Sequence, residues 1–350
     1  MAAFTTIDDP SAYFKIQLYT GNGSANHAIT FDDTDTDMQP DLVWIKNRDA
    51  TDQQMWFDSV RGATKVIGSN STDAETTDAD TLDSFTSDGF QVDADVKVNT
   101  NTEDYVAWCW KESATAGFDI ISYEGTGDNT NVSTAQNVNH SLSAVPHLMT
   151  MKNRSASGQG WPVYHHRNTS APETERLILN TTEATYDDTI PYDWNDTAPT
   201  SSVVSIGPGN RNNKDGDNII GYLWSEKQGF SKFGSYVGNG NADAPFVYTG
   251  FRPKFLIIKV SDAVNNWVLW DRERNPVNEG THCSLIPNGT DVDNCNTGYL
   301  VMDFLSNGFK YTDTNAIANT AGKTYVYIAF AFAPFVNSSG VPCTGGGAEE

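Results

Sequence analysis

The sequence predicts an all-β protein made of three tandem antiparallel β-sandwich modules of the jelly-roll or lectin-like kind. The first observation is an internal repeat, because four sequence markers recur three times, and a fifth recurs twice, in one order and about 100 residues apart. The second is a series of short apolar stretches rich in aromatic and β-branched residues, separated by turns rich in Gly, Asn and Asp. The third is that almost no stretch has the periodicity of a long amphipathic helix. Two sheets that cover one shared core satisfy this pattern.

Each repeat opens with a tyrosine and a glycine-rich turn, at residues 19–23, 123–127 and 236–240. These Gly-x-Gly turns precede polar loops rather than helices, so they do not fit a nucleotide-binding motif. We expect tight turns in which glycine supplies a positive φ.

The next markers are strands. A proline-led apolar strand that ends in lysine occupies residues 40–46, 146–152 and 253–259, and a tryptophan segment follows at 56–58, 161–165 and 267–271. Residues 84–90 and 303–309 are nearly identical, whereas the second repeat has the different segment 202–207 there. Aromatic strands close the repeats at 105–110, 219–224 and 325–330. Because side chains alternate along a strand, Trp108 and Trp110 are predicted to face one side, with Cys109 in the core.

The markers define the expected domains. They are an N-terminal docking segment at 1–12, sandwich repeats at 13–112, 113–228 and 229–335, and a flexible tail at 336–350. The connecting segments 111–116 and 225–228 are short. Short connections predict modules that pack against one another rather than modules on flexible tethers.

Composition limits the partners. A net charge of −23 opposes binding to the phosphates of nucleic acids. No run of about 18 apolar residues is present, so membrane insertion is not expected, and the N-terminus does not resemble a secretory signal. We therefore expect synthesis in a cytoplasm. The four cysteines lack zinc-site spacing, and the sequence leaves open whether Cys283 and Cys295 form a disulfide.

Calcium is the only cofactor with any sequence support. Asp33, Asp35 and Asp37 alternate as in a calcium loop, because Ca²⁺ prefers several oxygen ligands. The run lacks the glycine and glutamate that such a loop carries at its sixth and twelfth positions, so a solvated acidic loop is the competing interpretation. The acidic cluster at residues 73–80 has the same two interpretations.

Catalytic signals are weak. A glycosidase needs two carboxyls placed across a sugar, and Glu173 with Glu175, or Asp271 with Glu273, have a suitable spacing without the flanking apolar alternation. The adjacent His165 and His166 point to opposite faces of a strand and do not suit one metal. We predict no catalytic residues and a protein that is not an enzyme. Exposed aromatic rings remain candidates for stacking on sugars.

Four segments together resemble a large family of proteins encoded mainly by tailed bacteriophages of marine and aquatic bacteria. The segments are residues 5–14, 40–48, 57–65 and 229–236, and the resemblance extends over essentially the whole chain. It implies a virion structural protein with lectin- or glucanase-like β-sandwich modules. It supplies no established catalytic residues.

The leading hypothesis is a non-enzymatic virion surface protein, a tail-fibre or adhesin-type component that contacts other virion proteins or the host surface. We expect a homo-oligomer, commonly a trimer in such appendages, and a host surface glycan is a candidate ligand. One alternative is a head-decoration protein that stabilises the capsid. Another is a polysaccharide-degrading glycoside hydrolase of glucanase-like fold.

Overall fold

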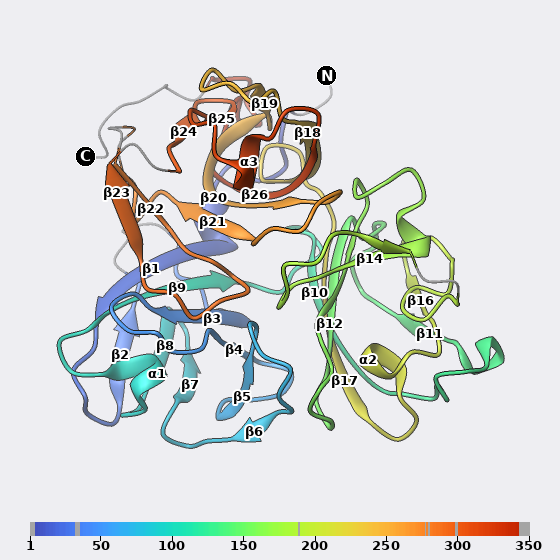
Figure 1. Cartoon of the computed structure of the whole chain (residues 1–350). Helices are drawn as coiled ribbons and strands as arrows, with labels where there is room; N and C mark the ends of the chain where they lie inside the picture. Colours follow the sequence, from blue (N-terminus) through green and yellow to red (C-terminus); the bar gives the residue numbers. More distant parts are fainter. Residues whose placement is uncertain are drawn as a thin grey trace.

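The computed structural model describes residues 4–31, 36–187, 190–276, 278, 281–297 and 300–342. It confirms the all-β prediction, with 42% of residues in strands and 6% in helices, and its sheets are antiparallel. The chain forms three lobes, one from each repeat, around a common centre (Figure 1). Each lobe contains a large sheet whose outer face is covered by a small sheet or by loops.

The first repeat has a large sheet of order β1-β9-β3-β4-β5-β6 and a small one of order β2-β8-β7. It begins after the 3₁₀ turn η1 (Pro10–Ala12). The elements are β1 (Phe14–Thr20), β2 (His27–Thr30), β3 (Leu42–Asn47), β4 (Met55–Asp58), β5 (Lys65–Gly68), β6 (Thr76–Thr77), β7 (Leu82–Thr86), β8 (Gly89–Val92), α1 (Val96–Asn99) and β9 (Asp104–Trp110).

The second repeat copies the large sheet in the order β10-β17-β12-β13-β14-β15, but its small sheet is only the pair β11-β16. The hairpin that the first repeat builds from β7 and β8 is thus replaced by one strand, as the divergent sequence at 202–207 predicts. The elements are β10 (Phe118–Glu124), η2 (Val132–Thr134), β11 (Gln136–Asn139), β12 (Leu148–Asn153), β13 (Pro162–His165), η3 (Pro172–Thr174), β14 (Glu175–Ile178), β15 (Tyr186–Asp187), β16 (Val203–Ile206), α2 (Asn210–Asn213) and β17 (Asn218–Trp224).

The third repeat has the sheets β18-β26-β20-β21 and β19-β25-β24, with the separate hairpin β22-β23. The elements are β18 (Ser231–Val237), β19 (Phe246–Tyr248), β20 (Phe251–Val260), β21 (Val268–Asp271), β22 (Thr281–Ser284), β23 (Asn294–Thr297), β24 (Met302–Leu305), β25 (Gly308–Tyr311), α3 (Ala316–Asn319) and β26 (Thr324–Pro334).

The large sheets are buried on both faces, which explains their nearly continuous apolar sequences. In β3, Val43 and Ile45 face the small sheet of the same repeat, whereas Leu42 and Trp44 face the centre of the molecule. Each repeat therefore has a core of its own between its two layers. A fourth core, at the centre, is shared by all three repeats.

Aromatic rings fill the shared core. Trp110, Trp224 and Phe330 occupy equivalent positions in β9, β17 and β26, and each contributes to it. Trp108 and Trp110 both face this core while Cys109 faces the core of the first repeat, which confirms the predicted alternation. Truncating a buried aromatic side chain costs about 3–5 kcal/mol, so this core contributes substantially to joining the repeats.

The opening glycines are required for two reasons, of which the expected positive φ is one. A Cβ on Gly21 would lie 2.1 Å from the Thr100 carbonyl oxygen, and one on Gly125 would lie 2.2 Å from that of Lys214. Only the second glycine of the turn has a positive φ, at Gly23 and Gly240. The first glycine instead lets the turn approach the end of the short helix.

The N-terminal segment packs on the same chain. Thr5 and Ile7 are buried, each with 2% of its surface exposed, and Ile7 belongs to the shared core. The Asp8 carboxylate accepts hydrogen bonds from the backbone N–H of Ser338 and from its hydroxyl. The segment predicted to dock on a partner is thus largely engaged with its own chain, and Phe4, Thr6 and Asp8 are its exposed described residues.

Candidate functional site

The repeats meet in a cyclic order, so that each contacts the other two. We call the contacts the 1/2, 2/3 and 3/1 junctions, after the repeats that they join. One backbone hydrogen bond recurs at all three. The pairs are Glu75 N to Arg154 O at 2.9 Å, Thr185 N to Ser261 O at 2.7 Å and Asp293 N to Arg48 O at 2.9 Å.

A second recurring contact comes from one equivalent position in each repeat. In the second and third repeats this position is the first residue of the tryptophan segment. The Trp161 indole N–H donates to the Gly68 carbonyl at 3.1 Å across the 1/2 junction, and that of Trp267 donates to the Ile178 carbonyl at 3.0 Å across the 2/3 junction. In the first repeat this position is Gln54, whose amide donates to the Ile286 carbonyl at 2.8 Å across the 3/1 junction. One donor thus links each repeat to its predecessor in the cycle.

The 1/2 junction contains a buried ionic network. The Arg61 guanidinium pairs with the Asp58 carboxylate and, at 3.3 Å, with Glu75. Arg154 of the second repeat makes a bidentate contact with Glu75 at 2.8 and 2.9 Å. The Tyr222 hydroxyl donates to Asp58 at 2.6 Å, so the network spans both repeats.

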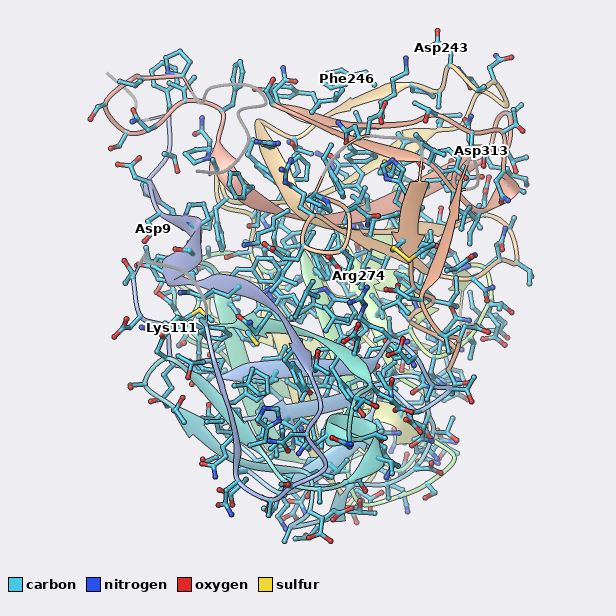
Figure 2. The ribbon with its side chains drawn as sticks, turned by 90° about the vertical axis from the view of Figure 1, so that its left-hand side faces the viewer. Asp9, Lys111, Asp243, Phe246, Arg274 and Asp313 are labelled. Atoms are coloured by element: carbon cyan, nitrogen blue, oxygen red, sulfur yellow. A yellow bond between two sulfur atoms is a disulfide. The ribbon has the colours of Figure 1, made fainter. Side chains whose placement is uncertain are left out.

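The 3/1 junction repeats this network at equivalent positions. Arg274 pairs with Asp271 at 2.7 Å and also with Asp293. Asp293 in turn accepts from Arg48 of the first repeat at 2.7 Å, and the Trp108 indole donates to Asp271 at 3.1 Å. Arg274 lies inside the molecule, between the ribbons of the third and first repeats (Figure 2).

The 2/3 junction replaces these ions with neutral groups. His165 stands where the other repeats have Asp58 and Asp271, and its Nε2 donates to the Tyr327 carbonyl at 3.1 Å. The Thr185 hydroxyl donates to the Asn168 side-chain oxygen at 2.7 Å. Burial lowers the pKa of His165 to about 3, although the bond to Tyr327 opposes the shift, so this imidazole is neutral at pH 7.

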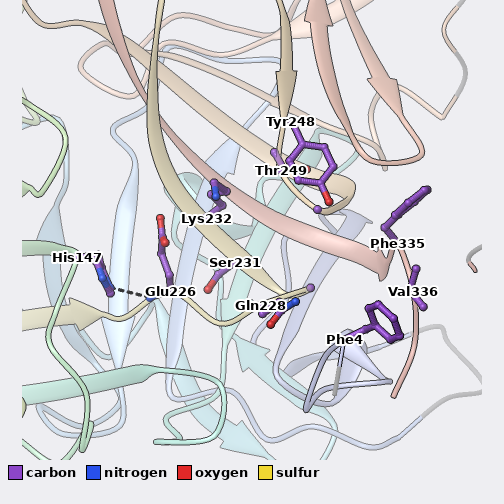
Figure 3. A pocket seen from close by; sticks show the side chains of 12 residues that line it. Phe4, His147, Glu226, Gln228, Ser231, Lys232, Tyr248, Thr249, Phe335 and Val336 are labelled. Atoms are coloured by element: carbon purple, nitrogen blue, oxygen red, sulfur yellow. Dashed lines mark hydrogen bonds between the residues drawn. The ribbon is translucent and has the colours of Figure 1, made fainter. Parts of the chain in front are cut away.

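A surface pocket of about 450 Å³ opens beside the 2/3 junction and is the candidate ligand-binding site. One side is aromatic and the opposite side is polar (Figure 3). The polar residues come mainly from the connector between the second and third repeats and from β18, and His147 comes from the residue before β12. The lining residues are Phe4, His147, Glu226, Gln228, Gly229, Ser231, Lys232, Tyr248, Thr249, Gly250, Phe335 and Val336.

The polar side is held in place by hydrogen bonds. The Glu226 N–H donates to Nδ1 of His147 at 3.0 Å, and the Glu226 carboxylate accepts from the Phe233 N–H at 2.8 Å. Nε2 of His166 lies 3.4 Å from the same carboxylate. Burial would raise the pKa of Glu226, but these two donors hold it below its usual value, so the carboxylate is ionised at neutral pH. Burial and the charge of His166 lower the pKa of His147.

The 1/2 junction has an equivalent cluster with the opposite balance of charge. There the Glu112 N–H donates to the Asp41 carboxylate at 2.7 Å, as Glu226 does to His147. Asp119 holds the strand position that Lys232 holds in β18. Burial and the neighbouring Asp119 raise the pKa of Glu112 to about 7.

The structure describes only one of the three predicted calcium ligands. Asp33 and Asp35 lie outside the described residues, and Asp37 is exposed. Of the second acidic cluster, Glu75 is an ion-pair partner of two arginines rather than part of a solvated loop.

The predicted carboxylate pairs do not form a sugar cleft. Glu173 and Glu175 line a recess of about 10 Å³, which is about the size of one water molecule. Asp271 is engaged with Arg274, and Glu273 instead pairs with Lys254 at 2.9 Å.

Cys283 and Cys295 form a disulfide that joins β22 to β23, which answers the question that the sequence left open. Cys109 is buried with a free thiol. Among the described residues, no helix is both long enough and apolar enough to cross a membrane.

Comparison with known proteins gives one match. Residues 9–334 match the sequence profile of a domain of unknown function, DUF7483. No curated protein and no solved structure matches the chain.

Proposed function

We propose that this chain, which belongs to the DUF7483 family of unknown function, is a non-enzymatic structural protein of a virion surface, of the tail-fibre or adhesin type. The proposal rests on the resemblance to tailed-phage proteins described above. One structural observation supports it, which is that buried charged side chains of one repeat contact side chains of the next repeat. Asp58 and Asp271, the acids at the ends of two tryptophan segments, each have an arginine partner and a donor from the next repeat.

Such a use of charge suits a display scaffold. A buried pair that loses one member is costly, by about 3–5 kcal/mol, so the 1/2 and 3/1 junctions hold their repeats in one arrangement. The loops outside the three lobes then have fixed relative positions, as a protein that presents contact surfaces to other molecules requires. Asp271 is unavailable as a catalytic acid or base while it is paired with Arg274 and Trp108.

Immunogold labelling of intact particles with an antibody to this chain tests the proposal. Label at the tail tip is the expected result and supports an adhesin. Label spread evenly over the head would replace this role with capsid decoration. Absence of the chain from purified particles, measured by mass spectrometry, would overturn a virion role.

A further inference from the structure

The pocket at the 2/3 junction contains a lysine ammonium, Lys232, beside the ionised Glu226 carboxylate, on a strongly acidic protein. The chain has a net charge of −23, yet no carboxylate among the described residues lies within 4.0 Å of the Lys232 ammonium, and Lys232 lines the pocket. At the polar side, the negative charge of Glu226 and the positive charges of Arg167 and Lys227 all act on His147. An unpaired ammonium in a pocket is suited to an anionic group on a ligand.

The aromatic side of the pocket is exposed to solvent. Tyr248 has 56% of its surface exposed and Phe4 has 50%, and both line the pocket together with Phe335. They face the side that carries Glu226 and Lys232 (Figure 3). Flat apolar ring faces opposite a few polar groups are typical of sites that hold a ring with an apolar face and a polar rim.

We propose that this pocket binds an acidic saccharide, with a carboxylate-bearing sugar unit such as a uronate as its recognition element. The sugar carboxylate pairs with Lys232, one sugar face packs on Tyr248, and hydroxyl groups bond to the Gln228 amide and the Glu226 carboxylate. The volume of about 450 Å³ accommodates one or two sugar rings. The inference rests on the proposed adhesin-type function and adds a ligand class and a site to it.

Calorimetric titration of the full chain with trigalacturonate tests the inference, with neutral maltotriose as the comparison ligand. We expect binding of trigalacturonate that weakens as salt is added, because the pairing is electrostatic. Lys232→Gln and Tyr248→Ala are each expected to weaken it about tenfold or more.

Two matched variants control for general damage. Phe246→Ala removes another exposed ring of the same strand, β19, that is not among the pocket residues, and Lys97→Gln removes a lysine from the first repeat. Both should bind trigalacturonate as the wild type does. Equal binding of maltotriose, equal loss in the control variants, or no binding of trigalacturonate and of further uronate oligomers would overturn the inference.

The experiment separates this inference from the proposed function. Failure to bind acidic saccharides, with label still at the tail tip, refutes the saccharide site alone. Saccharide binding by a chain that is absent from virions refutes the virion role and leaves the site standing.

Discussion

The 1/2 and 2/3 junctions place the same backbone geometry in opposite chemical settings. At both, a glutamate N–H donates to the residue that follows the leading proline of the strand, at 2.7 Å to Asp41 and at 3.0 Å to His147. At the 1/2 junction the nearby strand residue is the buried Asp119, whereas at the 2/3 junction it is Lys232. The buried links differ as well, because Asp58 and Arg61 are replaced by His165 and Asn168. The comparison teaches that the repeat specifies the backbone, and that substitutions at single positions decide whether a junction is ionic or open to a ligand.

The largest expected effect is a difference in stability loss between a variant of the ionic 1/2 junction and a variant of the neutral 2/3 junction. Arg61→Met leaves Asp58 as a buried charge without its arginine partner, and we expect it to lower the free energy of unfolding by about 3–5 kcal/mol. Asn168→Ala at the 2/3 junction removes only a neutral hydrogen bond and should cost about 1 kcal/mol. Urea unfolding of both variants measures the difference. Equal losses would contradict the distinction between the two junctions.

Acid should weaken the 2/3 junction through His165. The pKa of this residue is about 3 in the folded chain, against an ordinary value of 6.5, so the unfolded chain binds the proton first. Stability due to His165 is therefore complete above pH 6.5 and declines toward pH 3, at about 1.4 kcal/mol per pH unit. Unfolding by urea at several pH values, in the wild type and in His165→Gln, isolates this contribution. A variant with the same pH slope as the wild type would refute the assignment.

A smaller effect is expected at the 1/2 junction. The pKa of Glu112 is raised from 4.5 to about 7, so the folded chain binds the proton more tightly than the unfolded chain. Stability due to Glu112 thus falls as the pH rises from 4.5 to 7. Glu112→Gln should stabilise the protein above pH 7 by about 1–2 kcal/mol, after allowance for partial exposure, and should be neutral below pH 4.5.

Thermal unfolding of Glu112→Gln at pH 4 and pH 8 checks this expectation. Glu226→Gln serves as the control at the 2/3 junction, because the pKa of Glu226 is lowered and its carboxylate should not gain from neutralisation. A higher melting temperature for Glu226→Gln at pH 8 would show that the two junctions do not differ in this respect.

Local sequence patterns predicted the strands but not the junctions. Alternation places Trp108 and Trp110 on one face of β9, and the structure confirms it, since two-residue periodicity is a property of the strand itself. Arg48 and Asp293 are 245 residues apart in the chain, and no local pattern indicates that they meet. A signal was nevertheless present in the repeat alignment, where Arg48 and Arg154 both follow the lysine-ending strand.

The shared core was missed for a related reason. Repeats of about 100 residues are long enough to fold alone, so the sequence favours one core for each. The continuous apolar run from Leu42 to Ile45 was the evidence for a second buried face. The pocket was not predicted because its aromatic side combines Phe4, Tyr248 and Phe335, which the chain brings together from its two ends and its third repeat.

The cyclic arrangement of repeats within one polypeptide has a consequence for valency. A ring of three identical subunits presents three identical junctions, but here His165 stands where the other two junctions have Asp58 and Asp271, so the 2/3 junction differs from both. One chain therefore carries one pocket that is lined by Lys232. In the proposed binding, a surface that displays many copies of a ligand would place only one of them in each chain. In the proposed adhesin, avidity for such a surface comes from many chains held on one particle, where the spacing between neighbours sets the effective concentration.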